Sequence, residues 1–205
     1  MIEIEAVEVR TRRQTLLPAT TLTLRPGERR LWSAPPGDAH PALALVVGGR
    51  MRPSRGHVLL DGRDDVAALR HAVALVDTPL VSEPDSALHV GTVVGEELAL
   101  AGRPAGPRDV SSWLAEHGVP SRHLLFGELE PLTRTRVLAE LAAAGPRVQH
   151  LVITLPDRHG GEPAAWWALA SELAERGYGV LVQSTDTTAR VLAAGLVAEP
   201  HLELL

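Results

Sequence analysis

One segment of the sequence has the composition of an anion-binding loop. Residues 33–38 are rich in proline and glycine, and they lead into an apolar stretch over 39–47 that Gly48 and Gly49 end. A loop that opens a helix can hold an anion on backbone N–H groups and on the positive end of the helix dipole. His40 lies in the first turn, where a protonated imidazole would add a donor. The favoured interpretation is a surface histidine that only opens the helix, with anion binding as the alternative.

Histidines and carboxylates elsewhere are the second group that could do chemistry. His117, His123 and the run Asp157-Arg158-His159 carry metal-ligating or acid/base side chains. The nine histidines show none of the compact spacings of known zinc sites, so scattered surface residues are the favoured interpretation and we predict no metal site. Residues 157–161 read as a polar loop after a strand, with a turn used by a partner as the alternative.

The composition excludes several chemistries. All 20 basic residues are arginine, and the 205 residues include no lysine and no cysteine. This excludes a lysine nucleophile, a lysine on nucleotide phosphates and a cysteine zinc site. The net charge of −5 argues against nucleic acid as a partner. We interpret one arginine cluster as the solvated face of a small sheet: Arg10, Arg12, Arg13, Arg29 and Arg30.

The elements that must position these residues follow an α/β pattern. Alternating apolar residues in the first thirty-odd positions, including Leu31 and Trp32, predict a small antiparallel sheet. Residues from about 90 to 145 read as helical, and a strand, a helix and a strand follow in the order of a parallel sheet. No apolar run approaches the roughly 20 residues of a membrane span. The expected strands are 57–60, 73–76, 151–155 and 179–182, and the expected helices are 39–47, 93–100, 110–116, 132–144 and 163–176.

The landmarks from residue 25 to 62 resemble, in order and spacing, those of the ATP-binding cassette family, the ATPase subunits of ABC transporters. They are Arg25-Pro-Gly-Glu28, the loop and helix over 34–49, Pro53-Ser-Arg-Gly56 and Leu60-Asp-Gly62. The family's phosphate loop reads Gly-x-x-Gly-x-Gly-Lys-Ser-Thr-Leu, in which lysine reaches the phosphates and the next hydroxyl binds magnesium. The resemblance places His40 at the lysine and Pro41 at the hydroxyl. The loop positions carried over are Gly37, Ala39, His40, Pro41 and Ala42.

The resemblance extends over essentially the whole chain, and the residues that handle nucleotide are replaced throughout. The signature sequence Leu-Ser-Gly-Gly-Gln falls on residues 129–133, where Glu130 would point an acid toward a phosphate. The magnesium-binding aspartate and the glutamate that polarises water fall on Thr154 and Leu155. The remaining counterparts are Thr11 for the adenine-stacking aromatic, Thr78 or Asp77 for the glutamine, Thr185 for the switch histidine and Gly160-Gly161 for the end of the D-loop.

The resemblance implies one ABC ATPase-like domain over residues 1–205, with a P-loop NTPase-like core sheet flanked by helices, a small N-terminal antiparallel subdomain and a helical subdomain at about 90–145. Because the nucleotide motifs are replaced, we predict a pseudo-ATPase that serves as a structural or regulatory module. No cofactor is expected, unless residual binding of ATP and magnesium survives. The implied partner is a membrane-embedded transport or secretion protein, bound through the helical subdomain.

The implied location is cytoplasmic, at the inner face of the plasma membrane. The alternative function is a subunit of low activity that shares a composite nucleotide site with an intact ABC ATPase.

Overall fold

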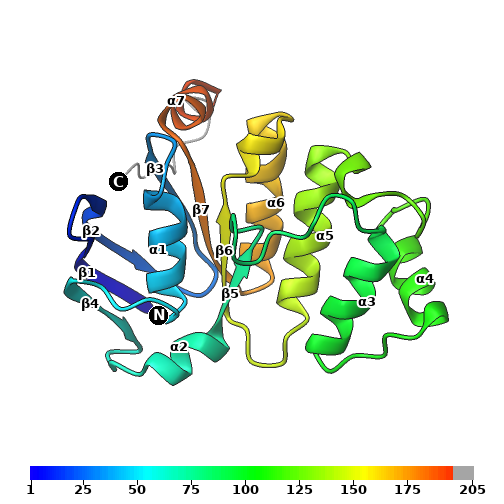
Figure 1. Cartoon of the computed structure of the whole chain (residues 1–205), viewed down its shortest axis with the longest axis horizontal. Helices are drawn as coiled ribbons and strands as arrows, with labels where there is room; N and C mark the ends of the chain where they lie inside the picture. Colours follow the sequence, from blue (N-terminus) through cyan, green and yellow to red (C-terminus); the bar gives the residue numbers. More distant parts are fainter. Residues whose placement is uncertain (196–205) are drawn as a thin grey trace.

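The computed structural model describes residues 1–195, which form two sheets and the helices that cover them (Figure 1). The strands are β1 (Ile2–Arg10), β2 (Thr15–Leu24), β3 (Arg29–Ala34), β4 (Arg55–Leu60), β5 (Val73–Val76), β6 (His150–Thr154) and β7 (Gly179–Thr185). The helices are α1 (Ala39–Val47), α2 (Val66–Ala72), α3 (Val90–Leu100), α4 (Pro107–Glu116), α5 (Pro131–Ala143), α6 (Pro163–Glu175) and α7 (Asp186–Gly195), with short 3₁₀ turns η1 (Phe126–Glu128) and η2 (Pro156–His159).

The small sheet is antiparallel, in the order β2-β1-β4. Ile2 of β1 lies opposite Leu24 of β2 and Leu60 of β4, which sets the register of all three strands. Apolar side chains at alternate positions, such as Ile2 and Ile4, are buried in one cluster with Leu43 of α1. The predicted antiparallel sheet is confirmed for β1 and β2, and β4 completes it.

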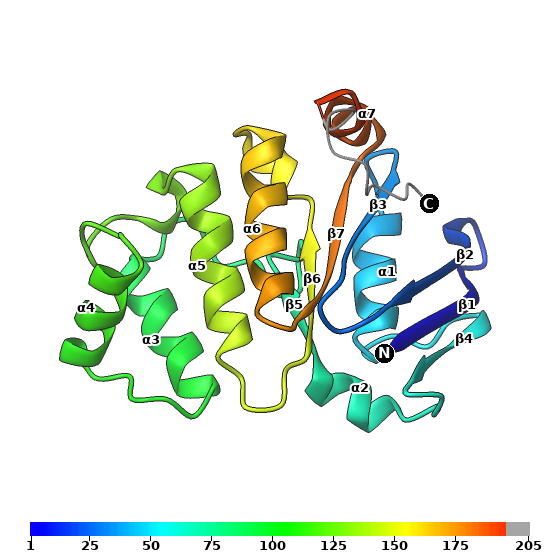
Figure 2. The same cartoon turned by 180° about the vertical axis from the view of Figure 1, so that it is seen from behind.

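The larger sheet is parallel, in the order β3-β7-β6-β5. Both faces of β6 are buried: Leu151 and Ile153 pack in the cluster that includes α5 and α6, and Val152 packs with α1 and the small sheet. Figures 1 and 2 show α1 on one face of this sheet and α6 on the other. Strands covered on both faces are continuously apolar, which is why the predicted strand, helix and strand near the end of the chain were recognisable.

Two local predictions were wrong. Leu31 and Trp32 lie in β3, which pairs with β7 in the parallel sheet and not with the small sheet. Arg29 also lies in β3, and its guanidinium group stands 4.6 Å from the ring centre of Trp167, so the five arginines do not share one solvated face. Trp167 and its neighbour Trp166 are both buried, at 4% and 3% exposed.

The predicted helical region contains α3, α4 and α5, whose ends differ from the predicted ends by a few residues. In Figure 1, α3 and α4 lie at one end of the molecule, beside α5. The short helix α2 and the helix α7 were not predicted; α7 starts directly after β7, without a turn residue between them. Among residues 1–195, no helix has both the length and the apolarity needed to cross a bilayer.

Candidate functional site

The predicted site residues gather at the edge where the parallel strands end. β3, β5, β6 and β7 run in the same direction, so the segments that follow them meet at one edge of the sheet. This is where open α/β sheets usually bind ligands. The structure brings four of the predicted site residues together at this edge: His40, Thr78, Thr154 and Thr185. The first and the last of them are more than a hundred positions apart in the sequence.

His40 is fully buried beneath the start of α1, so the interpretation as a surface histidine is wrong. Its Nε2 donates to the carbonyl oxygen of Ser184 at 3.0 Å. Its ring meets the ring of Trp32 edge-on, with centroids 5.2 Å apart. The cause is strand pairing: Ser33 of β3 lies beside Ser184 of β7, so the helix after β3 begins over the end of β7.

The neighbours of His40 add no cation to the loop. Pro41 has no backbone N–H, and the N–H of Ala42 donates to the carbonyl oxygen of Asp38. The side chain of Asp38, which precedes α1, accepts a 3.4 Å hydrogen bond from Gln14 and adds a negative charge at the helix start. The Nδ1 atom of His40 and the side-chain amide of Gln183 lie buried without a hydrogen-bond partner among the described residues.

Two threonines occupy the end of β6. The hydroxyl oxygens of Thr154 and Thr78 are 2.9 Å apart, and both side chains are fully buried. Each hydroxyl therefore has the other as its partner, away from solvent. Leu155, which follows, has a left-handed backbone with φ of 50° and leads into Pro156. At this edge the strand thus ends in a hydrogen-bonded pair of neutral groups and carries no carboxylate.

Asp157 joins η2 to the end of β7. Its Oδ2 accepts hydrogen bonds from the backbone N–H of Thr185 at 3.0 Å, from the Thr185 hydroxyl at 2.8 Å and from the Thr188 hydroxyl at 2.8 Å. Its Oδ1 is buried without a hydrogen-bond partner among the described residues. The sequence identified Thr185 but not Thr188, because α7 was not predicted.

A network of charged side chains surrounds Asp77, the residue after β5. Both carboxylate oxygens of Asp77 accept from Arg134 of α5, at 2.9 and 3.0 Å. The Nη2 atom of Arg158 lies 3.0 Å from Oδ1 of Asp77 and 3.0 Å from Glu83. The Nε2 atom of His159 lies 2.9 Å from Oδ2 of Asp77. We call these five residues the Asp77 network.

The Asp77 network is nearly dry at its centre. Asp77 and Arg134 are each 3% exposed. Burial alone would raise the pKa of Asp77, but the contacts with His159 and Arg134 and the charge of Arg158 outweigh it and lower the pKa to about 2. The carboxylate is therefore ionised at neutral pH and ties together the segment after β5, helix α5 and the turn after β6.

The same cluster is the one grouping in residues 1–195 whose ligand atoms lie close enough to hold a metal: Asp77, Glu83 and His159. Two guanidinium groups already contact Asp77, and their positive charges would repel a cation. The arrangement can therefore hold three structural segments in place, but it is poorly suited to a metal. His117 and His123 are not part of this grouping; the ring of His117 stacks on Trp113.

Glu130 has a local partner. Its Oε2 accepts from the backbone N–H of Thr133 at 2.9 Å and from the Thr133 hydroxyl at 3.2 Å, so it caps the start of α5. The backbone N–H groups of Thr133 and Leu132 lower the pKa of Glu130. Pro131 follows in the first helical position, which suits a helix start.

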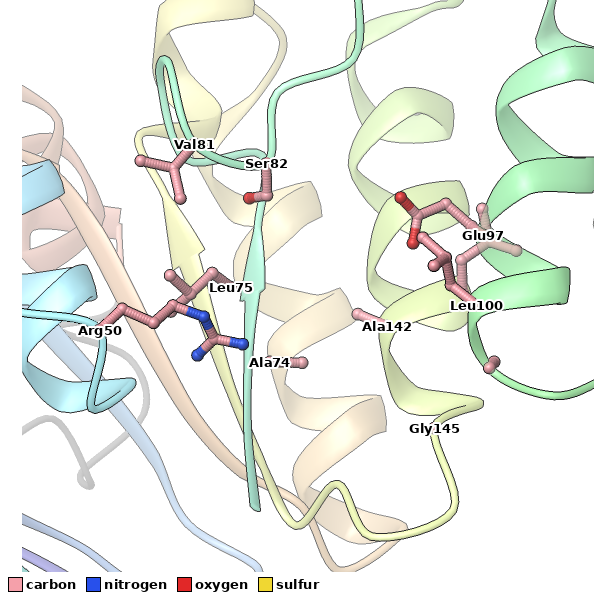
Figure 3. Close-up of a pocket in the computed structure, with 11 residues that line it drawn as sticks. Arg50, Ala74, Leu75, Val81, Ser82, Glu97, Leu100, Ala142 and Gly145 are labelled. Atoms are coloured by element: carbon pink, nitrogen blue, oxygen red, sulfur yellow. The ribbon is translucent and has the colours of Figure 1, made fainter. Parts of the chain in front are cut away.

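A groove of about 410 Å³ opens between β5, the segment after it, α3 and α5. Figure 3 shows Arg50 beside β5 and Glu97 on α3, with apolar side chains between them. Burial raises the pKa of Glu97, and the neighbouring Glu96 adds to the effect. Three large apolar side chains stand exposed here: Leu100 and Val81 in the lining, at 81% and 44%, and Leu80, the residue before Val81, at 101%. We call this the α3–α5 groove.

No model of a known protein family matches the sequence, and no curated protein matches it. Solved structures do match. An ABC transporter ATP-binding protein from Pyrococcus furiosus is 16% identical, with 90% of this chain and 91% of that chain covered and a TM-score of 0.67. A nucleotide-free ATP-binding cassette from an ABC transporter is 17% identical, with 94% and 84% covered and a TM-score of 0.66. CbiO1 from Clostridium perfringens, part of the ABC transporter complex CbiONQ, is 16% identical, with 90% and 77% covered and a TM-score of 0.62.

The fold is that of an ABC transporter ATP-binding subunit. The resemblance stated from the sequence is thereby confirmed for the architecture: a parallel core sheet, a small antiparallel sheet and helices that cover both. At 16–17% identity the likeness shows the fold alone. The chemistry of this chain therefore depends on its own residues.

The sequence missed most of the polar contacts at this edge. Arg134 and Asp77 are 57 positions apart, and Arg158 and Asp77 are 81 apart, so no local pattern connects them. One signal was available: acidic residues close behind buried strands, with Asp77 directly after β5 and Asp157 three residues after the end of β6. In a parallel sheet such residues lie at the same edge.

Proposed function

We propose that the chain is an ABC ATPase-like domain, with a helical subdomain at about 90–145, that acts without hydrolysing nucleotide as a structural or regulatory subunit of a membrane-embedded transport or secretion protein. The ABC fold supports the coarse part of this proposal, because the similar structures are ATP-binding proteins of ABC transporters. The proposed location is the cytoplasmic side of that membrane partner.

The hydrogen bond between Thr78 and Thr154 is the observation that carries the proposal. The resemblance assigns the magnesium-binding aspartate to Thr154 at the end of β6 and the glutamine to Thr78 or Asp77 after β5. Magnesium prefers carboxylate and water oxygens in an octahedral site. Here two neutral hydroxyls are buried against each other. With Pro41 in place of a hydroxyl and His40 turned toward Ser184, these residues do not fit a magnesium–nucleotide complex.

The α3–α5 groove supports the proposal of a membrane-embedded partner. Leu100 in its lining, and Leu80 next to the lining residue Val81, are exposed apolar side chains that cost free energy in water, whereas a partner's apolar side chains would cover them. Glu97 gives the α3 side of the groove a negative charge. The partner segment that fits is a short amphipathic helix, with an apolar face and a basic residue opposite Glu97.

The first test is titration of the purified protein with magnesium-ATP to several millimolar, followed by tryptophan fluorescence and calorimetry. Trp32 contacts His40, so its emission reports on the start of α1, and Trp32→Phe assigns the signal. We expect no saturable change and no phosphate release. Turnover that Asp157→Asn abolishes would overturn the proposal. Nucleotide occupancy that is restored by mixing with an intact ABC ATPase would favour the composite-site alternative.

The second test measures binding to membrane vesicles from the cells that express the protein. Leu100→Glu puts a charge into the α3–α5 groove, and Val191→Glu changes an exposed apolar residue of α7 as the matched control. We expect co-sedimentation of the wild type and of Val191→Glu, and roughly tenfold weaker binding of Leu100→Glu, because a buried unpaired charge opposes docking. Equal binding of all three proteins would contradict docking through this groove.

A further inference from the structure

A second groove, of about 620 Å³, lies where α1 ends, between the segment after it, β4 and α2. Three arginine side chains line it: Arg50, Arg52 and Arg70. Apolar side chains complete the wall, including Met51 and Val66. We call it the arginine groove. It is separate from the start of α1, because that helix has nine residues and its ends are roughly 13 Å apart.

Two of the arginines are held in place by backbone carbonyl groups. Nη1 of Arg50 donates to the carbonyl oxygens of Gly48 at 2.9 Å and of Val73 at 3.2 Å. Nε of Arg70 donates to the carbonyl oxygen of Gly49 at 2.8 Å. These bonds fix both side chains at the end of α1 and leave other N–H groups of each guanidinium without a protein partner among residues 1–195. Their orientation is therefore set before any ligand arrives, which lowers the entropy cost of binding.

The groove keeps an excess of positive charge. Within the described part of the chain, Arg52 makes neither a hydrogen bond nor an ion pair, and Asp64 is the carboxylate among the lining residues. His57, which also lines the groove, lies 3.0 Å from Glu5. Burial lowers the pKa of Arg50, and the charge of Arg70 lowers it further. The repulsion between these two cations is an unfavourable interaction that a bound anion would relieve.

We propose that the arginine groove binds a phosphate group carried on an apolar body. Guanidinium groups bind phosphate through paired N–H donors, and Arg52 and Arg70 have such donors available. The volume lies in the range of small-molecule sites, and the apolar wall gives the rest of the ligand a surface to cover. A free organic phosphate and the headgroup of a phosphate-bearing lipid share this chemistry. The site is independent of whether the protein hydrolyses ATP.

The test uses the full chain and two probes. Phenyl phosphate, with benzyl alcohol as its neutral counterpart, is titrated by calorimetry to represent a free ligand. Phosphatidylcholine vesicles with and without phosphatidic acid are used in sedimentation to represent a lipid headgroup. Arg52→Gln and Arg70→Gln each remove one guanidinium, and Arg103→Gln removes an exposed arginine of the α3–α4 connection as the matched control.

We expect saturable binding of at least one phosphate probe, roughly tenfold weaker in Arg52→Gln and in Arg70→Gln and unchanged in Arg103→Gln. Binding of phenyl phosphate alone identifies a free ligand, and binding of phosphatidic acid vesicles alone identifies a lipid. No binding of either probe at millimolar concentration, or equal weakening by Arg103→Gln, overturns the proposal. Repeating the magnesium-ATP titration with Arg52→Gln separates the two proposals: ATP binding that this change removes occurs in the arginine groove, whereas ATP binding that persists counts against the proposed pseudo-ATPase.

Discussion

The two ends of the parallel sheet treat their polar groups differently. At the end where the strands finish, the side chains contact one another: Thr78 meets Thr154, Asp157 accepts from Thr185, and the Asp77 network links three segments. At the end where the strands start, some polar groups of the described residues have no partner. The ring nitrogens of His150, the first residue of β6, have no hydrogen-bond partner among residues 1–195, and Arg52 makes no polar contact there.

This difference indicates which edge of the sheet has groups available to a ligand. Open α/β sheets usually bind ligands where the strands finish, because loops and helix starts converge there. In this protein most of that edge is satisfied internally, although His40 Nδ1 and the Gln183 amide are buried without partners. Side chains with free hydrogen-bond donors and unneutralised charges lie at the opposite end of the described sheet, where Arg50 donates to the carbonyl oxygen of Val73 at the start of β5. The fold is thus that of an ABC transporter ATP-binding subunit, but polar groups remain available at the edge where the strands start.

Breaking the Asp77 network has the largest expected effect. Arg134→Met leaves the Asp77 carboxylate buried beside a smaller positive charge, and we expect a loss of about 3–5 kcal/mol in the free energy of unfolding, measured with urea. The matched control is Arg136→Met on the same helix, whose partner Glu172 is half-exposed, with an expected loss of about 1 kcal/mol or less. Equal losses would mean that the edge is not held by this network.

The end of the sheet where the strands start is tested through His150, whose protonation makes the stability of the protein depend on pH. Burial and the nearby positive amino terminus lower its pKa from 6.5 to about 4, against a smaller opposite effect of Asp61. The unfolded chain therefore binds the proton of His150 more tightly than the folded chain does. The contribution of neutral His150 to the free energy of unfolding is fully present above pH 6.5 and is lost as the pH drops toward 4. At about pH 5 the loss amounts to about 2 kcal/mol.

His150→Leu should remove this pH dependence, and His71→Gln, a change at an exposed histidine of α2, should keep it. Urea unfolding at several pH values measures both. If the slope between pH 4 and 6.5 persists in His150→Leu, another group causes it.

The smallest expected effect concerns the threonine pair. Thr78→Val and Thr154→Val each leave one buried hydroxyl without its partner, and each should cost about 1–2 kcal/mol. The double variant should cost no more than either single variant, since no unpaired hydroxyl remains. Additive losses in this double-mutant cycle would show that the hydroxyls do not depend on each other, and the contrast between the two ends would lose one of its supports.

Local patterns predicted most of the elements and few of the contacts. The strand over 73–76 has the predicted ends, and so does the helix over 39–47, because runs of apolar residues bounded by glycine or by charged residues are visible in the sequence. His40 was misjudged, since its burial depends on β7, which is about 140 positions away and lies beside β3. Arg29 was misplaced for the same reason. The assignment of a strand to one of two sheets is a matter of pairing, not of composition.

Residue composition alone excludes several chemistries. A chain without lysine and cysteine has neither a lysine for nucleotide phosphates nor a thiolate, whatever its fold. Which polar groups remain available depends on the folded arrangement. A hydrogen bond needs its two atoms about 3 Å apart, so whether Asp77 contacts Arg134, or whether Arg52 has a polar partner among the described residues, depends on how distant segments pack. Residue types set what a side chain can do, and packing sets which of those possibilities remain.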